Sequence, residues 1–448
     1  MENVLIVDGY SSARFYPKIL KKLGYAPHHL MSGMELEDNY RTTFNLHLFD
    51  ENEYEKNISG NYRSVEELAE ELAPYHFSAV LPGCEGSVLF ANALAKQMEL
   101  PYNEGAITGV LRNKYDMQQA LAKANLKHIR SLKTADIEEL LAWKKEQNLE
   151  KIVIKPLADS ASNSVFICED EDYIRKVFSD VLFSKDECGK VNQELICQEF
   201  IDGDEYVVNH VSKNGKHVLG DIERYSKVIS ADGHPLYDSE ELLNPLSPEY
   251  ENIVVYVQKA LDALNLTVGP SHAEVKLTKE GPVLIEVGAR LVGGIPEDPQ
   301  LFQFFAPFIE LAAKAYLNPS KSLLEEPYTP IHLPGMTGLL KFLLAYEDKK
   351  LESVPAKEIL ASLPTAKVVD VDKTMKLLHI EETRGLETTT GKVFLIGDKN
   401  DVMRDYRAVC YLEREKPYLL YRASEDPQPT SDDLQLLEEM KRGEFVSS

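Results

Sequence analysis

The chain has 448 residues, of which 44% are apolar, and a formal net charge of −24. A chain of this length can bury a large core and is expected to form about three domains. Its acidity argues against nucleic acid and anionic membranes as partners, because both attract clusters of positive charge.

The cysteines and the N-terminal residues predict the cellular compartment. Five cysteines are scattered along the chain without a Cys-x-x-Cys spacing, which is typical of a reducing compartment and gives no zinc site. The first residues begin directly in a strand pattern, and no apolar run reaches about 18 residues. We therefore expect a soluble, cytoplasmic protein.

Strands alternate with helices in the first hundred residues. We expect strands at 4–7, 45–49 and 79–82, and helices ending near Gly24, starting after Ser64 and spanning 85–98. This alternation predicts a parallel sheet covered on both faces. The first turn lacks a Gly-x-Gly-x-x-Gly fingerprint, so no dinucleotide site is expected there. Residues 83–86 are either a ligand-binding turn or a plain loop, and we assign them no catalytic role.

Two lysines in the next segment are candidate phosphate ligands. Lys114 begins a helix that runs through Lys123, where it is either a surface charge or a phosphate ligand. Lys155 ends an apolar strand, where a cation is costly unless it is paired. It is followed by a loop of small polar residues whose backbone amides can surround a polyphosphate; these include Ser160, Ser162 and Ser164. The alternative for Lys155 is a side chain that reaches water.

Residues 195–208 predict a strand, a tight turn at Gly203 and a second strand. Glu205 begins that second strand, where it either accepts hydrogen bonds from a sugar diol or lies on the surface. Residues 224–245 are rich in turn signals and are expected to form a substrate loop. An amphipathic helix is expected at 251–264.

Residues 272–278 and 282–288 alternate between apolar and polar side chains and are joined by a link that contains Gly281, so they predict a β-hairpin. The face expected to pack inward carries Ala273, Val275, Leu277, Val283, Ile285 and Val287.

Glu274 and Glu286 lie on the other face of this predicted hairpin, directly opposite each other. Like charges in this arrangement repel. A divalent cation, preferably Mg²⁺, would relieve the repulsion, and Arg290 just beyond the second strand could bind a phosphate or oxyanion beside it. The alternative is a solvated face on which Lys276 and water screen the charges.

The chain changes character after residue 331, where an α+β appendage is expected. Its predicted strands are 337–344, 367–371, 375–380 and 392–396, and its predicted helix is 400–414. Residues 424–433 read as an acidic linker, followed by a tail that is either helical or disordered.

In this order, the motifs resemble those of ATP-grasp ligases, most closely the L-amino-acid ligases that make dipeptides. The resemblance implies an α/β and α+β fold with a Rossmann-like N-terminal domain, an ATP-binding lid, a core with the metal site and a C-terminal α+β domain. The corresponding ranges are 1–110, 111–205, 206–330 and 331–448.

The resemblance also implies roles for individual residues. Lys114, Lys155 and the loop with Ser160, Ser162 and Ser164 would bind the ATP phosphates. The backbone of Gln198, Glu199, Phe200 and Ile201 would bind adenine, and Glu205 the ribose. Glu274 and Glu286 would hold Mg²⁺, or Mn²⁺ as an alternative, and Arg290 would steady the acyl phosphate and the tetrahedral intermediate.

Two positions depart from the family pattern. Gly288 stands where many members have asparagine, which would leave the metal one amide oxygen short. Ser164 stands where a loop glycine is common, which should make the loop less free.

The implied function is the ATP-dependent joining of two small-molecule amino acids, with the carboxylate activated as an acyl phosphate and ADP and phosphate released. The alternatives are a different amine acceptor, either a carrier protein or a biosynthetic intermediate, and a non-catalytic ATP-binding regulator. A homodimer is expected by analogy with the family. The residues do not identify a general base for the amine.

Overall fold

The structure is a computed structural model that describes residues 1–33, 48–60, 64–158, 164–185, 190–230, 233–317 and 328–446. It contains two compact units. The first is Met1–Ile222 with Pro245–Ile331, and the second is Glu223–Asn244 with His332–Ser448. The chain passes from one unit to the other within strand β10 (Lys216–Ile229).

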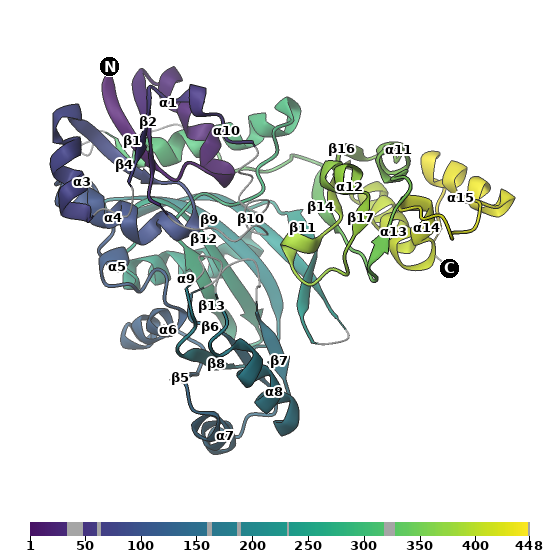
Figure 1. Cartoon of the computed structure of the whole chain (residues 1–448), viewed down its shortest axis with the longest axis horizontal. Helices are drawn as coiled ribbons and strands as arrows, with labels where there is room; N and C mark the ends of the chain where they lie inside the picture. Colours follow the sequence, from purple (N-terminus) through teal and green to yellow (C-terminus); the bar gives the residue numbers. More distant parts are fainter. Residues whose placement is uncertain are drawn as a thin grey trace. The chain divides into compact units, whose positions relative to one another are not determined.

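The first unit begins with a parallel sheet in the order β3-β2-β1-β4 (Figure 1). Its strands are β1 (Glu2–Val7), β2 (Tyr25–Met31), β3 (Lys56–Ser59) and β4 (Phe77–Pro82). Helices α3 (Val65–Leu72) and α4 (Val88–Gln97) pack with Leu5 and Val7 on one face. Helices α1 (Tyr16–Lys22) and α10 (Pro299–Tyr316) pack on each other and contact β2 and β4. The predicted parallel sheet and the Ser64 capping box are confirmed.

The prediction of a strand at 45–49 is wrong for the two residues of this range that the structure describes. Residues 45–47 lie outside the described residues, and Leu48 and Phe49 are not in a strand. The neighbour of β1 is instead β2, which starts directly after Gly24. This strand was missed because Pro27 and two histidines interrupt its apolar pattern, yet both histidines are buried.

The ATP-binding lid predicted for the first unit contains an antiparallel sheet in the order β5-β8-β6-β7. Its strands are β5 (Ser131–Thr134), β6 (Ile152–Pro156), β7 (Phe166–Cys168) and β8 (Leu195–Glu199). Helices α7 (Ile137–Glu146) and α8 (Glu171–Val181) cover one face through a shared apolar core around Leu140, Ile154 and Phe178. Before this sheet come α5 (Glu104–Ile107) and α6 (Lys114–Lys123).

The predicted hairpin is formed by β12 (Val268–Thr278) and β13 (Gly281–Gly288), which is preceded by α9 (Glu251–Ala263). Strand β12 also pairs with β9 (Asp204–Lys213). The register shifts after Glu274, so Val275 pairs with Leu284. As a result Leu284 is buried and Ile285 is only partly buried, which corrects the predicted inward face at this position.

The second unit is α+β, as predicted. Its strands are the end of β10, β11 (Pro235–Leu242), β14 (Thr337–Leu343), β18 (Gly391–Gly397) and β16 (Ala366–Asp370), with a separate pair β15 (Lys349–Lys350) and β17 (His379–Ile380). Its helices are α11 (Ala356–Ala361), α12 (Asp372–Leu377), α13 (Lys399–Glu415), α14 (Pro417–Leu420) and α15 (Ser431–Lys441).

Two predictions for this unit need correction, and the alternative left open for the tail is decided in favour of a helix. Residues 224–229 and 235–242 lie in the paired strands β10 and β11 and not in a loop, with Arg224 paired to Glu241, and a role in substrate binding stays a prediction. Half of the predicted strand at 375–380 lies in helix α12, because its apolar residues Met375 and Leu377 are exposed and do not alternate into a core, and only His379–Ile380 form a strand, β17. The tail contains helix α15, and Phe445 packs into the core of this unit.

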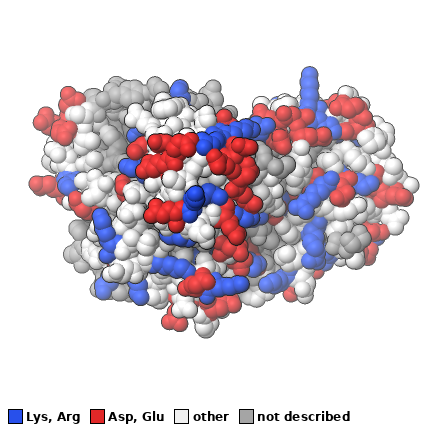
Figure 2. Space-filling model, turned by 90° about the horizontal axis from the view of Figure 1, so that it is seen from below, with Lys and Arg blue, Asp and Glu red and all other residues white. Residues whose placement is uncertain are grey.

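Acidic and basic side chains are interspersed over the described residues of the face shown in Figure 2. None of the helices in the described part of the chain combines the length and apolar character needed to cross a membrane.

Candidate active site

The two hairpin carboxylates face each other as predicted. Glu274 of β12 and Glu286 of β13 are register partners, and both side chains are partly buried. Within the described residues, no group of three or more His, Cys, Asp or Glu side chains is arranged to hold a metal ion. Two carboxylates nevertheless fit Mg²⁺, because this ion is commonly held by one or two carboxylates and by substrate phosphates. Glu274 and Glu286 would therefore hold the metal only together with a nucleotide.

Lys114 is a cation that the structure pairs with one of these two carboxylates, Glu286. Its Nζ lies 3.0 Å from Glu286 Oε2, and its residue is only 7% exposed. Asn113 caps helix α6 by accepting hydrogen bonds from the N–H groups of Tyr115 and Asp116, which fixes the start of the helix at Lys114. The sequence left open whether Lys114 is a surface charge, and its burial decides against that.

Lys276 does not screen the two carboxylates. Its Nζ lies 3.4 Å from Glu205 Oε2 and donates to the Gly203 carbonyl at 3.1 Å. Lys276 is therefore directed to Glu205, the acid predicted to bind the ribose.

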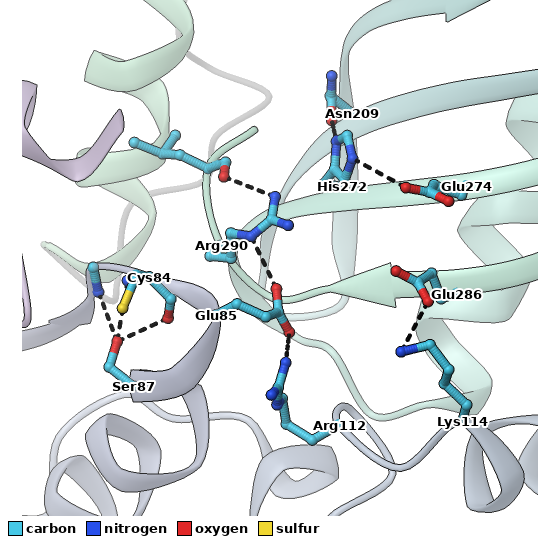
Figure 3. A network of polar contacts seen from close by, with 12 residues as sticks. Cys84, Glu85, Ser87, Arg112, Lys114, Asn209, His272, Glu274, Glu286 and Arg290 are labelled. Carbon is cyan, nitrogen blue, oxygen red and sulfur yellow. Dashed lines mark hydrogen bonds and ion pairs between the residues drawn. The ribbon is translucent and has the colours of Figure 1, made fainter. Parts of the chain in front are cut away.

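A buried ion-pair chain connects the N-terminal sheet to the predicted catalytic arginine (Figure 3). Glu85 follows strand β4, and its carboxylate lies 2.7 Å from Arg112 Nη1 and 2.9 Å from Arg290 Nε. Burial raises the pKa of Glu85, but the two guanidinium groups outweigh burial, so its pKa lies below the usual value. Glu85 is thus ionised, and one net positive charge remains on the triad.

A second chain of polar contacts leads to Glu274 (Figure 3). Asn209 Nδ2 donates to Asp221 Oδ1 at 2.5 Å, and Asn209 Oδ1 lies 3.0 Å from His272 Nδ1. Because an amide oxygen only accepts, His272 Nδ1 carries a proton, which fixes the ring. His272 Nε2 then lies 3.8 Å from Glu274 Oε1. Burial raises the pKa of Asp221 to about 7, although the hydrogen bond from Asn209 opposes this shift.

The lid residues are placed as follows. Lys155 lies on β6 and is 5% exposed, so it does not extend freely into water. Ser160 and Ser162 lie outside the described residues. Ser164 has φ +53°, a left-handed conformation that favours glycine.

The run predicted to bind adenine lies at the end of β8. Gln198 donates to Ser131 Oγ at 2.9 Å, and the Glu199 carboxylate accepts from Arg130 Nε at 2.7 Å. The Phe200 N–H donates to the Lys151 carbonyl at 3.3 Å, and Ile201 follows directly. These contacts fix the course of the backbone, while the adenine-binding role stays a prediction.

Four residues of these networks were not predicted from the sequence: Glu85, Arg112, Asn209 and Asp221. Glu85 had one signal in the sequence, because an acid in the turn after a parallel strand lies at the edge where ligands bind in such sheets. Asn209 and Asp221 lie inside strands and had none.

Comparison with known proteins places this geometry in a family. The family description "ATP-grasp domain" matches residues 149–297. Dapdiamide A synthase from Enterobacter agglomerans is 31% identical over 327 residues, which are 72% of this chain and 75% of that protein. The L-arginine-specific L-amino acid ligase of Bacillus subtilis is 24% identical over 144 residues, 32% of this chain and 34% of that one.

A solved structure, the L-amino acid ligase from Bacillus licheniformis, has a similar fold with a TM-score of 0.64. It is 17% identical, and the match covers 92% of this chain and 97% of that one. The fold and the matches together define a class, the ATP-dependent ligases that form C–N bonds. Within this class, the chain belongs to the ATP-grasp carboxylate-amine ligases.

Proposed function

We propose that this ligase joins two amino acids, activating the carboxylate of the first as an acyl phosphate and transferring the acyl group to the amine of the second. The observation that carries this proposal is the grouping of Glu274, Glu286, Lys114 and Arg290 in one site. A relative named as an L-amino acid ligase supports amino acids as substrates. ADP and phosphate would be released.

Each charged group has a physical role in this reaction. A carboxylate is a poor electrophile, so its activation requires phosphoryl transfer from ATP. Lys155 and Lys114 would offset the charge of the nucleotide phosphates. Mg²⁺, or Mn²⁺, held by Glu274 and Glu286 with the phosphates would further neutralise charge on the transferring group.

Arg290 would act on the second half of the reaction. When the amine attacks the acyl carbon, an oxyanion develops, and the guanidinium would stabilise it before phosphate leaves. Water competes with the amine for the acyl phosphate, so we propose that residues 155–210, most of which belong to the lid domain of residues 111–205, close over the site during the reaction. Gln198 to Ile201 would hold adenine and Glu205 the ribose of ATP.

The test is phosphate release from ATP and Mg²⁺ against a matrix of L-amino acids, singly and in pairs, with product masses recorded. Release that depends on a pair, together with a dipeptide mass, is the expected result. No release with any pair would overturn the dipeptide proposal.

A second candidate is the same activation with a different amine acceptor, such as a carrier protein or a biosynthetic intermediate. One relative, dapdiamide A synthase, covers 72% of this chain. Its name does not say that the acceptor is an amino acid, and this favours the second candidate. The two candidates separate in the same assay: phosphate release that needs one amino acid but no second one, with hydroxylamine trapping the acyl group, supports this candidate. We also propose that the protein is cytoplasmic and forms a homodimer. The molar mass measured by light scattering tests the homodimer.

A further inference from the structure

Gly288 lies beside Glu85, although the two residues are about two hundred positions apart in the sequence. A Cβ atom added to Gly288 would lie 2.6 Å from Glu85 Oε2 and 3.4 Å from Arg290 Cζ. The carboxylate of Glu85 therefore occupies the space that a side chain at 288 would need. Gly288 is not among the residues with positive φ, so the reason for glycine here is space and not backbone conformation.

The contacts of Arg290 explain what this arrangement achieves. Its Nε faces Glu85 at 2.9 Å, and its Nη1 donates to the Leu291 carbonyl at 3.1 Å (Figure 3). A guanidinium held along these two edges has one orientation, which leaves Nη2 for a further partner. Because Glu85 is itself held by Arg112, the orientation of Arg290 is set by a rigid buried group.

We propose that Glu85 is a positioning residue for Arg290, and that position 288 is a glycine in order to admit its carboxylate. The N-terminal sheet thereby contributes to the ligase site through the residue that follows β4. The role given to Arg290 in catalysis rests on the proposed function, whereas the positioning itself does not.

Substitutions at both positions test this coupling. Glu85→Gln keeps the shape of the side chain and removes its charge, and Gly288→Ala displaces the carboxylate without removing it. Each should lower kcat about tenfold to a hundredfold, the effect of losing one close charge–charge contact, with the KM for ATP within about threefold of the wild type. Because both act on one contact, the double variant should be no slower than Glu85→Gln alone.

A size exchange sharpens the test. Glu85→Asp withdraws the carboxylate by one methylene, so it should make room for the alanine Cβ and recover activity in Gly288→Ala. The matched control is Glu310→Gln, which removes a carboxylate paired with Lys22 and Lys314 away from this site and should leave kcat unchanged.

A readout without substrate separates this inference from the proposed function. The Nε–H signal of Arg290 in ¹⁵N NMR, assigned by its loss in Arg290→Lys, should be protected from exchange in the wild type and in Glu310→Gln, and should lose protection in Glu85→Gln and Gly288→Ala. Unchanged protection in those two variants would overturn the positioning role even if the wild type makes dipeptides. Protection lost as expected, in a wild type that forms no dipeptide, would leave positioning intact and reject only the function.

Two kinetic results would also overturn the inference. One is a kcat for Glu85→Gln within twofold of the wild type. The other is a loss of kcat that follows a fall in melting temperature in both variants, because that would indicate a merely structural ion pair.

Discussion

Lys114 Nζ lies 3.0 Å from Glu286 Oε2, so a predicted phosphate ligand and a predicted metal ligand neutralise each other in the structure. A nucleotide with its metal would satisfy both groups, the phosphate taking Lys114 and the metal taking Glu286. Each group is thus the counter-charge of the other, so neither of the two is left buried without one.

Replacing Lys114 tests its role as a phosphate ligand. A charge-assisted hydrogen bond contributes about 1.5–3 kcal/mol, so Lys114→Met should raise the KM for ATP about tenfold to a hundredfold. Lys114→Arg keeps the positive charge and should raise the KM for ATP by a smaller factor. Calorimetric titration with ADP measures the same loss directly, and an ADP affinity of Lys114→Met within twofold of the wild type would reject the phosphate-binding role.

Glu286→Gln should abolish metal-dependent turnover. Without the charge of Glu286, Mn²⁺ binding in the presence of ADP should weaken, and ADP formation should fall more than about a hundredfold, beyond the loss usual for an outer-shell partner. Electron paramagnetic resonance of free Mn²⁺ measures the binding. The control is Glu280→Gln in the hairpin turn, where the side chain is 77% exposed, and it should behave as the wild type. Equal Mn²⁺ affinity in both variants would show that Glu286 is not a metal ligand.

Asp221 should make stability depend on pH. Its pKa is raised from 3.8 to about 7 by burial, so the folded state binds this proton more tightly than the unfolded state does. As pH rises from about 4 to about 7 the unfolded state loses the proton first, and the free energy of unfolding should fall by up to a few kcal/mol.

The asparagine of Asp221→Asn cannot ionise, so the free energy of unfolding of this variant should fall less between about pH 4 and about pH 7. Urea denaturation midpoints at pH 4.5, 6 and 7.5 compare the two proteins. Parallel pH profiles of wild type and variant would contradict the shifted pKa.

The local patterns of the chain predicted much of the fold and part of the site. The alternation of apolar and polar residues on both sides of Gly281 was sufficient to predict the hairpin and to place Glu274 opposite Glu286. The same pattern missed the register shift after Glu274, which buries Leu284 in place of Ile285. A shift of this kind depends on how the strand packs against its neighbours, which alternation alone does not specify.

Non-local contacts were beyond the reach of the sequence. Glu85 acquires its role only because the fold brings it to Arg112 and Arg290, and its loop alone indicated no more than a possible ligand-binding turn. For the same reason Gly288 looked like a lost metal ligand in the sequence, whereas the structure shows a carboxylate from another part of the chain in that space.

Lys341 should be the most sensitive charged residue of the second unit. Its Nζ is fully buried, 3.0 Å from Asp238 Oδ1 and 2.7 Å from Glu413 Oε2. Lys341→Met would leave two carboxylates buried without their cation, and breaking a buried ion pair in this way costs about 3–5 kcal/mol.

The matched control for Lys341 is Lys357→Met, which breaks an exposed pair with Asp372 and should cost at most about 1 kcal/mol. Urea denaturation monitored by hydrogen exchange of helix α13 reports on this unit. If the two substitutions destabilise α13 equally, the buried triad of Lys341, Asp238 and Glu413 does not stabilise the unit, and apolar packing alone holds it together.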